Sequence, residues 1–179
     1  SLNSFDKVLS DNISDDFEFC MPTKVDLNLL EDLYLGNEKK INYLNEIINN
    51  PNFQCFAYKE KKTGKIAYAR WLCSNSFYSS VLKIEMKFNI NQVLTLDSYT
   101  HPNYRYNRLH YNMNIEMLLW LKRNSNITEV FMVIKGFVFH IKKLACFLGY
   151  KHVSTTFYYK KGSIPFYYKA LLKKLSIIE

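Results

Sequence analysis

The feature that most constrains this fold is the order in which the apolar residues change their spacing. After a strand-like segment at residues 17–20, residues 26–36 and 38–49 carry apolar side chains at helical spacing. The middle of the chain has the aromatic-rich pattern of strands, and the last third alternates helix with strand. This order predicts an α/β (α+β) fold with a mixed sheet, antiparallel at the front and with a parallel pair behind.

The later elements follow from the same patterns. Strands are predicted over residues 53–59, 65–73, 81–88, 92–100, 129–135 and 151–160, with a polar loop at 74–80, helices at about 109–122 and 137–148, and a strand or helix at 166–178. The first two of these strands are joined by Lys61-Lys62-Thr63-Gly64, which predicts a tight hairpin turn.

Helix boundaries have local signals of their own. Asp26 is expected to cap the first helix, and Val25 is expected to pack on Leu30 as a hydrophobic staple. Gly36 and Gly149 each follow the last apolar residue of a helical pattern, where a residue with positive φ commonly ends a helix.

Size and composition suit one domain. We expect the polar, aperiodic residues 1–15 to form a flexible arm and residues 16–179 to form a single domain. Hydrophobic residues make up 48% and charged residues 22%, which excludes wholesale disorder. The run Met117–Leu121 is far shorter than the roughly 20 residues of a membrane span. The first thirty residues lack a secretion-signal pattern, so we expect a cytoplasmic protein without a membrane partner.

The chain is basic, with 24 Lys and Arg against 16 Asp and Glu and a net charge of +8. This charge favours anionic partners without choosing among them, and a solvated basic surface is the simpler interpretation. The four cysteines show no CxxC spacing and the four histidines no HxxxH spacing, so no metal site is predicted. The composition, rich in Asn, Lys, Ile and Tyr, suggests an AT-rich bacterial genome.

Two motifs, separated by a helix, a strand and a helix, resemble the GNAT family of acyl-CoA-dependent N-acyltransferases. The first runs from Leu94 to Arg105 and ends in His-Pro-Asn-Tyr-Arg, similar to the family's "P-x-Y-R" step from a strand into a turn and helix. The second runs from Leu144 to Tyr150, where a helix ends at a glycine and an aromatic residue begins the next strand. The resemblance covers about residues 15–162 and is strongest over 93–150.

The resemblance implies a GNAT-like fold: antiparallel strands with two helices, then β-α-β-α-β with a splayed parallel strand pair. It implies acetyl-CoA or another acyl-CoA as co-substrate, with the cofactor diphosphate bound by backbone amides at a helix N-terminus, where the helix dipole favours an anion. It also implies that the backbone of the preceding strand pairs with the pantetheine arm. The residues implied in cofactor binding are Asp97, Tyr99, Thr100, Arg105, Tyr106, Asn107, Arg108, Leu109 and His110.

The diphosphate loop departs from the family pattern R/Q-x-x-G-x-G/A. With Arg105 at its head, Arg108 and His110 occupy the two positions of the small residues. Arg108 either fills the space through which the phosphates would reach the backbone and abolishes cofactor binding, or places its guanidinium across the phosphates as a bidentate ligand. A third interpretation is a basic surface turn with Tyr104 and Tyr106 packed beneath it.

The catalytic end also departs from the family. Many members have a tyrosine acid four residues before the closing glycine, and that position here is Ala145. Cys146, Tyr158 and Tyr159 are the remaining substitutes. Glu85 and Asp97 are candidate bases. The plainer interpretation of Glu85 is a surface carboxylate flanked by lysines, and that of Asp97 is a strand residue that faces solvent.

We therefore expect an acyl-CoA-dependent N-acyltransferase, most simply one that transfers an acetyl group to a primary amine of a small molecule or peptide. The chain would act as a monomer or homodimer. One alternative is a degenerate GNAT-fold binding module that does not use acyl-CoA. The third is a basic nucleic-acid-associated domain, although no RNP or KH signature accompanies the aromatic residues and nucleic acid is not the expected partner.

Overall fold

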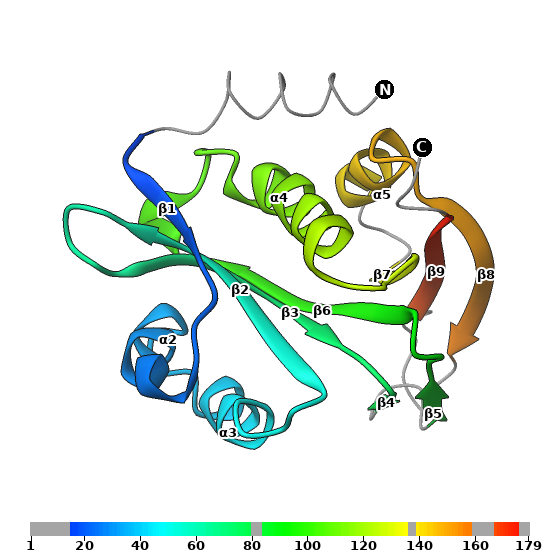
Figure 1. The fold of residues 1–179 in the computed structure, drawn as a ribbon, viewed down its shortest axis with the longest axis horizontal. Coiled ribbons are helices and arrows are strands. Elements are labelled where there is room, and N and C mark those ends of the chain that lie inside the picture. The colour runs from blue at the N-terminus through cyan, green and yellow to red at the C-terminus, as the bar shows by residue number, and fades with distance from the viewer. Residues whose placement is uncertain (1–14, 80–83, 136–138, 159–166, 176–179) are drawn as a thin grey trace.

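The computed structural model describes residues 15–79, 84–135, 139–158 and 167–175 (Figure 1). The arm predicted for residues 1–15 lies outside these ranges, apart from Asp15.

The fold is built on a seven-stranded mixed sheet. In spatial order its strands are β1 (Phe17–Cys20), β2 (Phe53–Glu60), β3 (Ile66–Cys73), β6 (Gln92–Thr100), β7 (Glu129–Lys135), β9 (Tyr167–Leu175) and β8 (Lys151–Tyr158). Neighbouring strands are antiparallel except β6 and β7, which are parallel. The prediction of a mixed sheet with a parallel pair in its second half is confirmed.

Helices cover both faces of this sheet. The helices are α2 (Leu27–Leu33), α3 (Glu38–Ile47), α4 (Leu109–Asn124) and α5 (Phe139–Phe147), with short 3-10 turns η1 (Lys24–Asp26) and η2 (Pro102–Tyr104). In Figure 1, α2 and α3 lie on one side of the sheet and α4 and α5 on the other. The two parallel strands β6 and β7 are joined through α4.

Alternation along the strands sorts the buried residues into two cores. In β2, Phe56 and Tyr58 pack in the cluster that contains α4, whereas Cys55 and Ala57 pack in the cluster that contains α2 and α3. Successive strand side chains point to opposite faces, so one strand supplies both cores. Every residue of β3 is buried, as expected of a strand covered on both faces.

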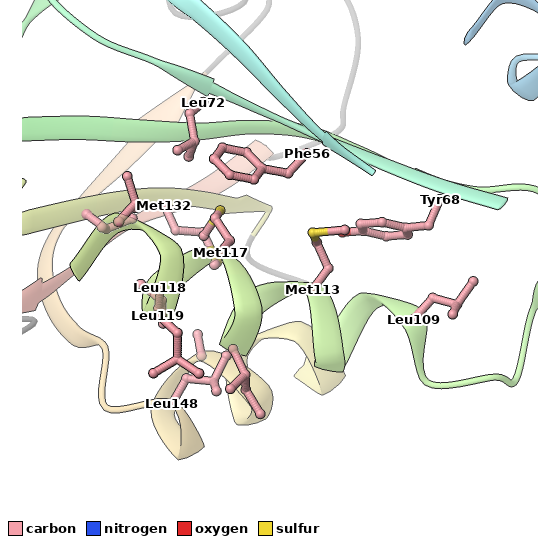
Figure 2. Close-up of a cluster of buried hydrophobic side chains, with 14 of the residues drawn as sticks. Phe56, Tyr68, Leu72, Leu109, Met113, Met117, Leu118, Leu119, Met132 and Leu148 are labelled. Atoms are coloured by element: carbon pink, nitrogen blue, oxygen red, sulfur yellow. The ribbon is translucent and has the colours of Figure 1, made fainter. Parts of the chain in front are cut away.

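The helical spacing predicted for α4 is confirmed as a buried stripe. Leu109, Met113, Met117 and Leu121 are each at most 3% exposed. Figure 2 shows the two methionines directed toward the sheet, where Met113 meets Tyr68. This packing holds the start of α4 close to the end of β6.

Two local expectations concern the start of α2. Val25 is 91% exposed and does not staple onto Leu30, because it lies in the 3-10 turn η1 that precedes α2, so this expectation is wrong. Asp26 is the N-cap residue of α2, as predicted, but its side chain makes no cap bond to that helix; its Oδ2 accepts a hydrogen bond of 2.9 Å from the backbone N–H of Thr23, closing a capping box on η1.

The segment 74–80, expected to be a polar loop, contains strand β4 (Ser76–Ser79). It pairs with β5 (Ile84–Lys87) in a separate two-stranded sheet. Pairing with the next strand along the chain overrides the polar composition here, since Phe77 lies opposite Met86. Of the predicted strand or helix at 166–178, the described residues form strand β9.

No helix among the described residues is both long and apolar enough to cross a membrane. Within the same ranges, no three His, Cys, Asp or Glu side chains are grouped so that they could hold a metal ion.

Candidate functional site

The parallel strands β6 and β7 separate partway along their length. They pair only from Gln92 opposite Glu129 to Thr95 opposite Met132. Beyond Thr95, β6 stays paired with β3 up to Thr100, but its other edge has no partner strand among the described residues. The structure places the predicted cofactor-binding residues Asp97, Tyr99 and Thr100 in this split segment, which is about 17 Å long at the usual rise of a strand.

A β-bulge lies at the point where the strands part. Trp71 of β3 lies opposite Leu96, but Arg70 lies opposite Ser98, so Asp97 is an extra residue in β6. A bulge bends its strand and increases the local twist, which accounts for the departure of β6 from β7. Leu96 and Tyr99 consequently both pack in the α2/α3 core although they lie three positions apart, a spacing that would place them on opposite faces of a regular strand.

The loop after β6 has a backbone suited to glycine at two positions. Tyr106 has φ +71° and Arg108 has φ +54°, both in the left-handed region. The loop is held in part by Asn107, whose Nδ2 donates 3.2 Å to the carbonyl oxygen of Tyr104. The backbone at Arg108 therefore has the conformation favoured by the family's first glycine, although the residue is arginine.

The N-terminus of α4 follows directly from this loop. Arg108 is the N-cap residue and makes no side-chain cap bond, and Arg105, Tyr106 and Asn107 are exposed beside it. In helix geometry the first amides, such as those of Leu109 and Tyr111, have no intrahelical acceptor, and the helix dipole adds partial positive charge. This surface fits the diphosphate of a coenzyme A thioester.

The two non-small residues of the loop point in different directions. His110 Nδ1 lies 2.9 Å from the hydroxyl oxygen of Tyr68, a fully buried side chain of β3. The imidazole therefore faces the sheet, and it does not join the exposed arginines at the loop surface. Arg108, in contrast, is exposed at the surface of the loop. Its side chain therefore decides between the two alternatives, that it obstructs the approach of the phosphates or that it binds them.

A polar group in the interior, which the sequence analysis missed, lies beneath α4. Arg70 is 3% exposed and donates from Nη1 to Asn114 Oδ1 at 2.7 Å. Asn114 in turn donates from Nδ2 to the carbonyl oxygen of His110 at 2.6 Å. Burial raises the pKa of Tyr68, although the charge of Arg70 opposes the rise. The available signal was an arginine in the middle of the apolar strand Ile66–Cys73.

The closing motif has the predicted geometry. Gly149 has φ +81°, and the backbone N–H of Tyr150 donates 2.9 Å to the carbonyl oxygen of Ala145. Ala145 is 1% exposed, so the position of the family's tyrosine acid is a small buried residue. Burial raises the pKa of Tyr150 to about 12, so its hydroxyl stays protonated. Of the suggested substitutes, Cys146 is exposed, and the side chains of Tyr158 and Tyr159 lie outside the described part of the structure.

The two candidate bases lie in different settings. Asp97 is half-buried at the bulge and forms an ion pair with Lys40 of α3, on the α2/α3 side of the sheet. Glu85 lies on β5, outside the seven-stranded sheet, with its side chain half exposed and 3.9 Å from the Nζ of Lys87. This placement is that of a surface carboxylate beside a lysine and gives no support to Glu85 as a catalytic base.

A cavity of about 940 Å³ opens next to Asp97 on the α3 side of the sheet. Its lining includes Asn37, Lys40, Tyr43, Phe53, Tyr78 and Asp97. Burial, with a contribution from the charge of Asp97, raises the pKa of Tyr43 to about 12. The cavity therefore offers two carboxylates, Glu46 and Asp97, two lysines and the phenols of Tyr43 and Tyr78 on the face of β6 opposite α4.

Comparison with known proteins gives a consistent result at the level of fold. No family model and no curated protein sequence matches the chain. A ribosomal-protein-S5-alanine acetyltransferase from Vibrio fischeri superposes with a TM-score of 0.67 at 10% identity, over 91% of this chain and 94% of that one. Arabidopsis thaliana NAA60 in complex with acetyl-CoA has a TM-score of 0.64 at 11% identity, over 89% and 98%.

A third similar structure is the spermidine/spermine N-acetyltransferase SpeG from Vibrio cholerae, with a TM-score of 0.64 at 9% identity, over 89% of this chain and 94% of that one. The strand order, the split parallel pair and these superpositions agree with the resemblance found in the sequence. The chain therefore has the fold of the GNAT acetyltransferases, with an arginine at the first small-residue position of the loop that precedes α4.

Proposed function

We propose that this protein is an acyl-CoA-dependent N-acyltransferase, which transfers an acyl group, most simply acetyl, to a primary amine. The observation that carries the proposal is the junction after Thr95: β6 leaves β7 and leads into a loop with left-handed residues and an uncapped helix start. A split strand pair alone would be a fold feature. Its continuity with an anion-binding helix N-terminus is what a coenzyme A thioester requires.

In this proposal the donor lies along the open edge of β6. The exposed residues Arg105 to Arg108 and the first amides of α4 hold the diphosphate, with the Arg108 guanidinium as an ionic ligand. Amides of the pantetheine arm pair with the backbone of Asp97, Tyr99 and Thr100. The thioester then comes toward the closed end of the split, beside the bulge.

The acceptor enters from the cavity on the α3 side, which reaches Asp97 from the opposite face. The amine nitrogen attacks the thioester carbonyl carbon, a C–N bond forms, the C–S bond breaks, and the amine proton passes to the proposed base Asp97. Lys40 must release this carboxylate, since the two side chains form an ion pair. Thioester aminolysis is downhill, so alignment of the reactants supplies much of the rate enhancement even without a tyrosine at position 145.

A small-molecule amine is the favoured acceptor. Some solved structures with this fold are spermidine or spermidine/spermine N-acetyltransferases, and the cavity lining contains a carboxylate that suits a cationic amine. We also propose that residues 16–179 form one domain, because a single sheet joins β1 near one end of the chain to β8 and β9 near the other.

Titration with acetyl-CoA tests the proposal. At a ligand concentration of 100 Kd, binding should raise the free energy of unfolding by about 2.7 kcal/mol, seen as a higher thermal midpoint. Release of free thiol should then depend on an added amine, measured with polyamines and with peptides that carry a free N-terminus. A midpoint unchanged at millimolar acetyl-CoA would refute the enzyme assignment.

One observation favours a second candidate function. Because Arg108 is exposed at a position whose backbone suits glycine, a loop that no longer admits coenzyme A would leave a GNAT-fold binding module. The same titration separates the two, since only the enzyme is stabilised by acetyl-CoA.

A further inference from the structure

Arg70 carries a buried positive charge for which the described residues provide no countercharge. Its side chain is 3% exposed, and the ion pairs of the described residues involve other cations. Asp97, the neighbour of Ser98 in β6, is paired with Lys40 on the opposite face of the sheet. Burying a cation without an anion costs several kcal/mol, so an anion bound beside Arg70 would offset this cost.

Two donors in this region lack an acceptor within the described part of the chain. The Nε of Arg70 and the hydroxyl of Tyr150 are both buried without a hydrogen-bond partner. Tyr150 is 4% exposed, and the positive charge of Arg70 acts on its hydroxyl. The guanidinium N–H can only donate and the phenol hydroxyl can donate, so one acceptor would satisfy both groups, and the guanidinium charge favours an acceptor that is negative.

The position of Arg70 in the sheet shows where Arg70 and Tyr150 lie with respect to the proposed acyl-CoA donor. Arg70 lies opposite Ser98, beside the bulge at the closed end of the split, and its side chain reaches Asn114 of α4. The diphosphate loop lies at the other, open end of the split. A thioester whose diphosphate lies at the start of α4 therefore directs its acyl end toward Arg70.

We propose that Arg70 and Tyr150 bind a carboxylate at the far end of the acyl group, so that the preferred donor is the coenzyme A thioester of a dicarboxylic acid. Asn114 holds the guanidinium in place through its 2.7 Å bond. This inference rests on the proposed function and narrows the donor. The reaction is unchanged: the amine forms the new C–N bond, the C–S bond breaks, and the carboxylate stays on the product.

Calorimetry on the full chain with coenzyme A, acetyl-CoA and succinyl-CoA tests the inference. Succinyl-CoA should bind about 10–100-fold more tightly than acetyl-CoA, as expected for charged hydrogen bonds in a buried site. Arg70→Met should remove this difference while leaving acetyl-CoA affinity within about threefold. Arg123→Met, which removes a cation from the exposed end of α4, is the matched control and should keep the preference.

Two further variants keep the test decisive if Arg70→Met does not fold. Tyr150→Phe removes only the hydroxyl and should reduce the preference about 3–10-fold. Asn114→Asp places a carboxylate against Arg70, at the expense of the bond to His110, and should abolish the preference. Equal binding of the two thioesters by the wild type, or a preference that survives Asn114→Asp, overturns the inference and leaves the proposed function standing. Failure of all three coenzyme A compounds to bind overturns both.

Discussion

Replacing Arg108 by glycine tests the diphosphate loop directly, because the backbone there already has a conformation that glycine adopts easily. Arg108 has φ +54°, and the left-handed conformation costs a residue with a Cβ about 1–2 kcal/mol. Glycine removes this cost but increases the entropy of the unfolded chain, which offsets about 0.5–1 kcal/mol. We expect Arg108→Gly to raise the free energy of unfolding by about 0.5–1 kcal/mol and Tm by about 1–4 °C.

Two comparison variants separate the backbone effect from the loss of the guanidinium. Arg108→Ala removes the charge but keeps the left-handed cost, so its Tm should not rise. Tyr106→Gly relieves the same kind of strain, at φ +71°, by replacing a side chain that is fully exposed. Thermal unfolding should therefore show a gain in both glycine variants, and a loss of stability in both would refute the argument from strain.

Affinity for acetyl-CoA, measured by calorimetry on the same proteins, decides what the guanidinium does. If it binds the diphosphate, Arg108→Ala and Arg108→Gly should each weaken binding about tenfold or more, as for other charged hydrogen bonds, whereas Tyr106→Gly, which keeps the Arg108 guanidinium, should weaken it less. We expect this weakening. Unchanged or tighter binding by both Arg108 variants would show that the side chain obstructs the loop.

Three other perturbations follow from the structure. Asp97→Asn should lower kcat about 100-fold or more with little change in KM for acetyl-CoA, whereas Lys40→Met, which removes only the ion-pair partner, should not lower kcat in this way. Equal losses of kcat in the two variants, measured by steady-state kinetics, would show that the Asp97–Lys40 pair has a structural role only. Burial raises the pKa of Glu116, whose carboxylate accepts a hydrogen bond of 2.7 Å from the hydroxyl of Tyr58. The folded protein therefore holds the Glu116 proton more tightly than the unfolded chain does, and the free energy of unfolding falls as pH rises through the folded pKa. Urea unfolding between about pH 4 and 7 should show a smaller fall in this free energy for Glu116→Gln than for the wild type. Met113→Ala, at a side chain that is 0% exposed, should cost about 2–5 kcal/mol of unfolding free energy in the same assay.

Most secondary-structure elements could be predicted because their signals are local. The stripe of Leu109, Met113 and Met117 identified α4, and Gly149, two residues after the end of α5, marked the stop of that helix and has φ +81°. The prediction failed where strand pairing decided the outcome, as in β4, a short Ser-Phe-Tyr-Ser segment that becomes a strand by pairing with β5, the next strand along the chain. Val25 shows that a local signal can also mislead, because one 3-10 turn before α2 is enough to turn its side chain outward.

The candidate site likewise has some features that the sequence predicted and others that only the structure revealed. The amino-acid sequence alone determined most of the order of strands and helices, the motif that ends at Arg105 and the arginine in place of a small residue, because each of these is written in contiguous residues. Only the tertiary structure decided that β6 leaves β7 after Thr95, that Arg70 bonds to Asn114 below α4, and that the Tyr150 hydroxyl is buried. Strand register, bulges and the burial of a charge arise from contacts between residues far apart in the chain, and no local pattern encodes them.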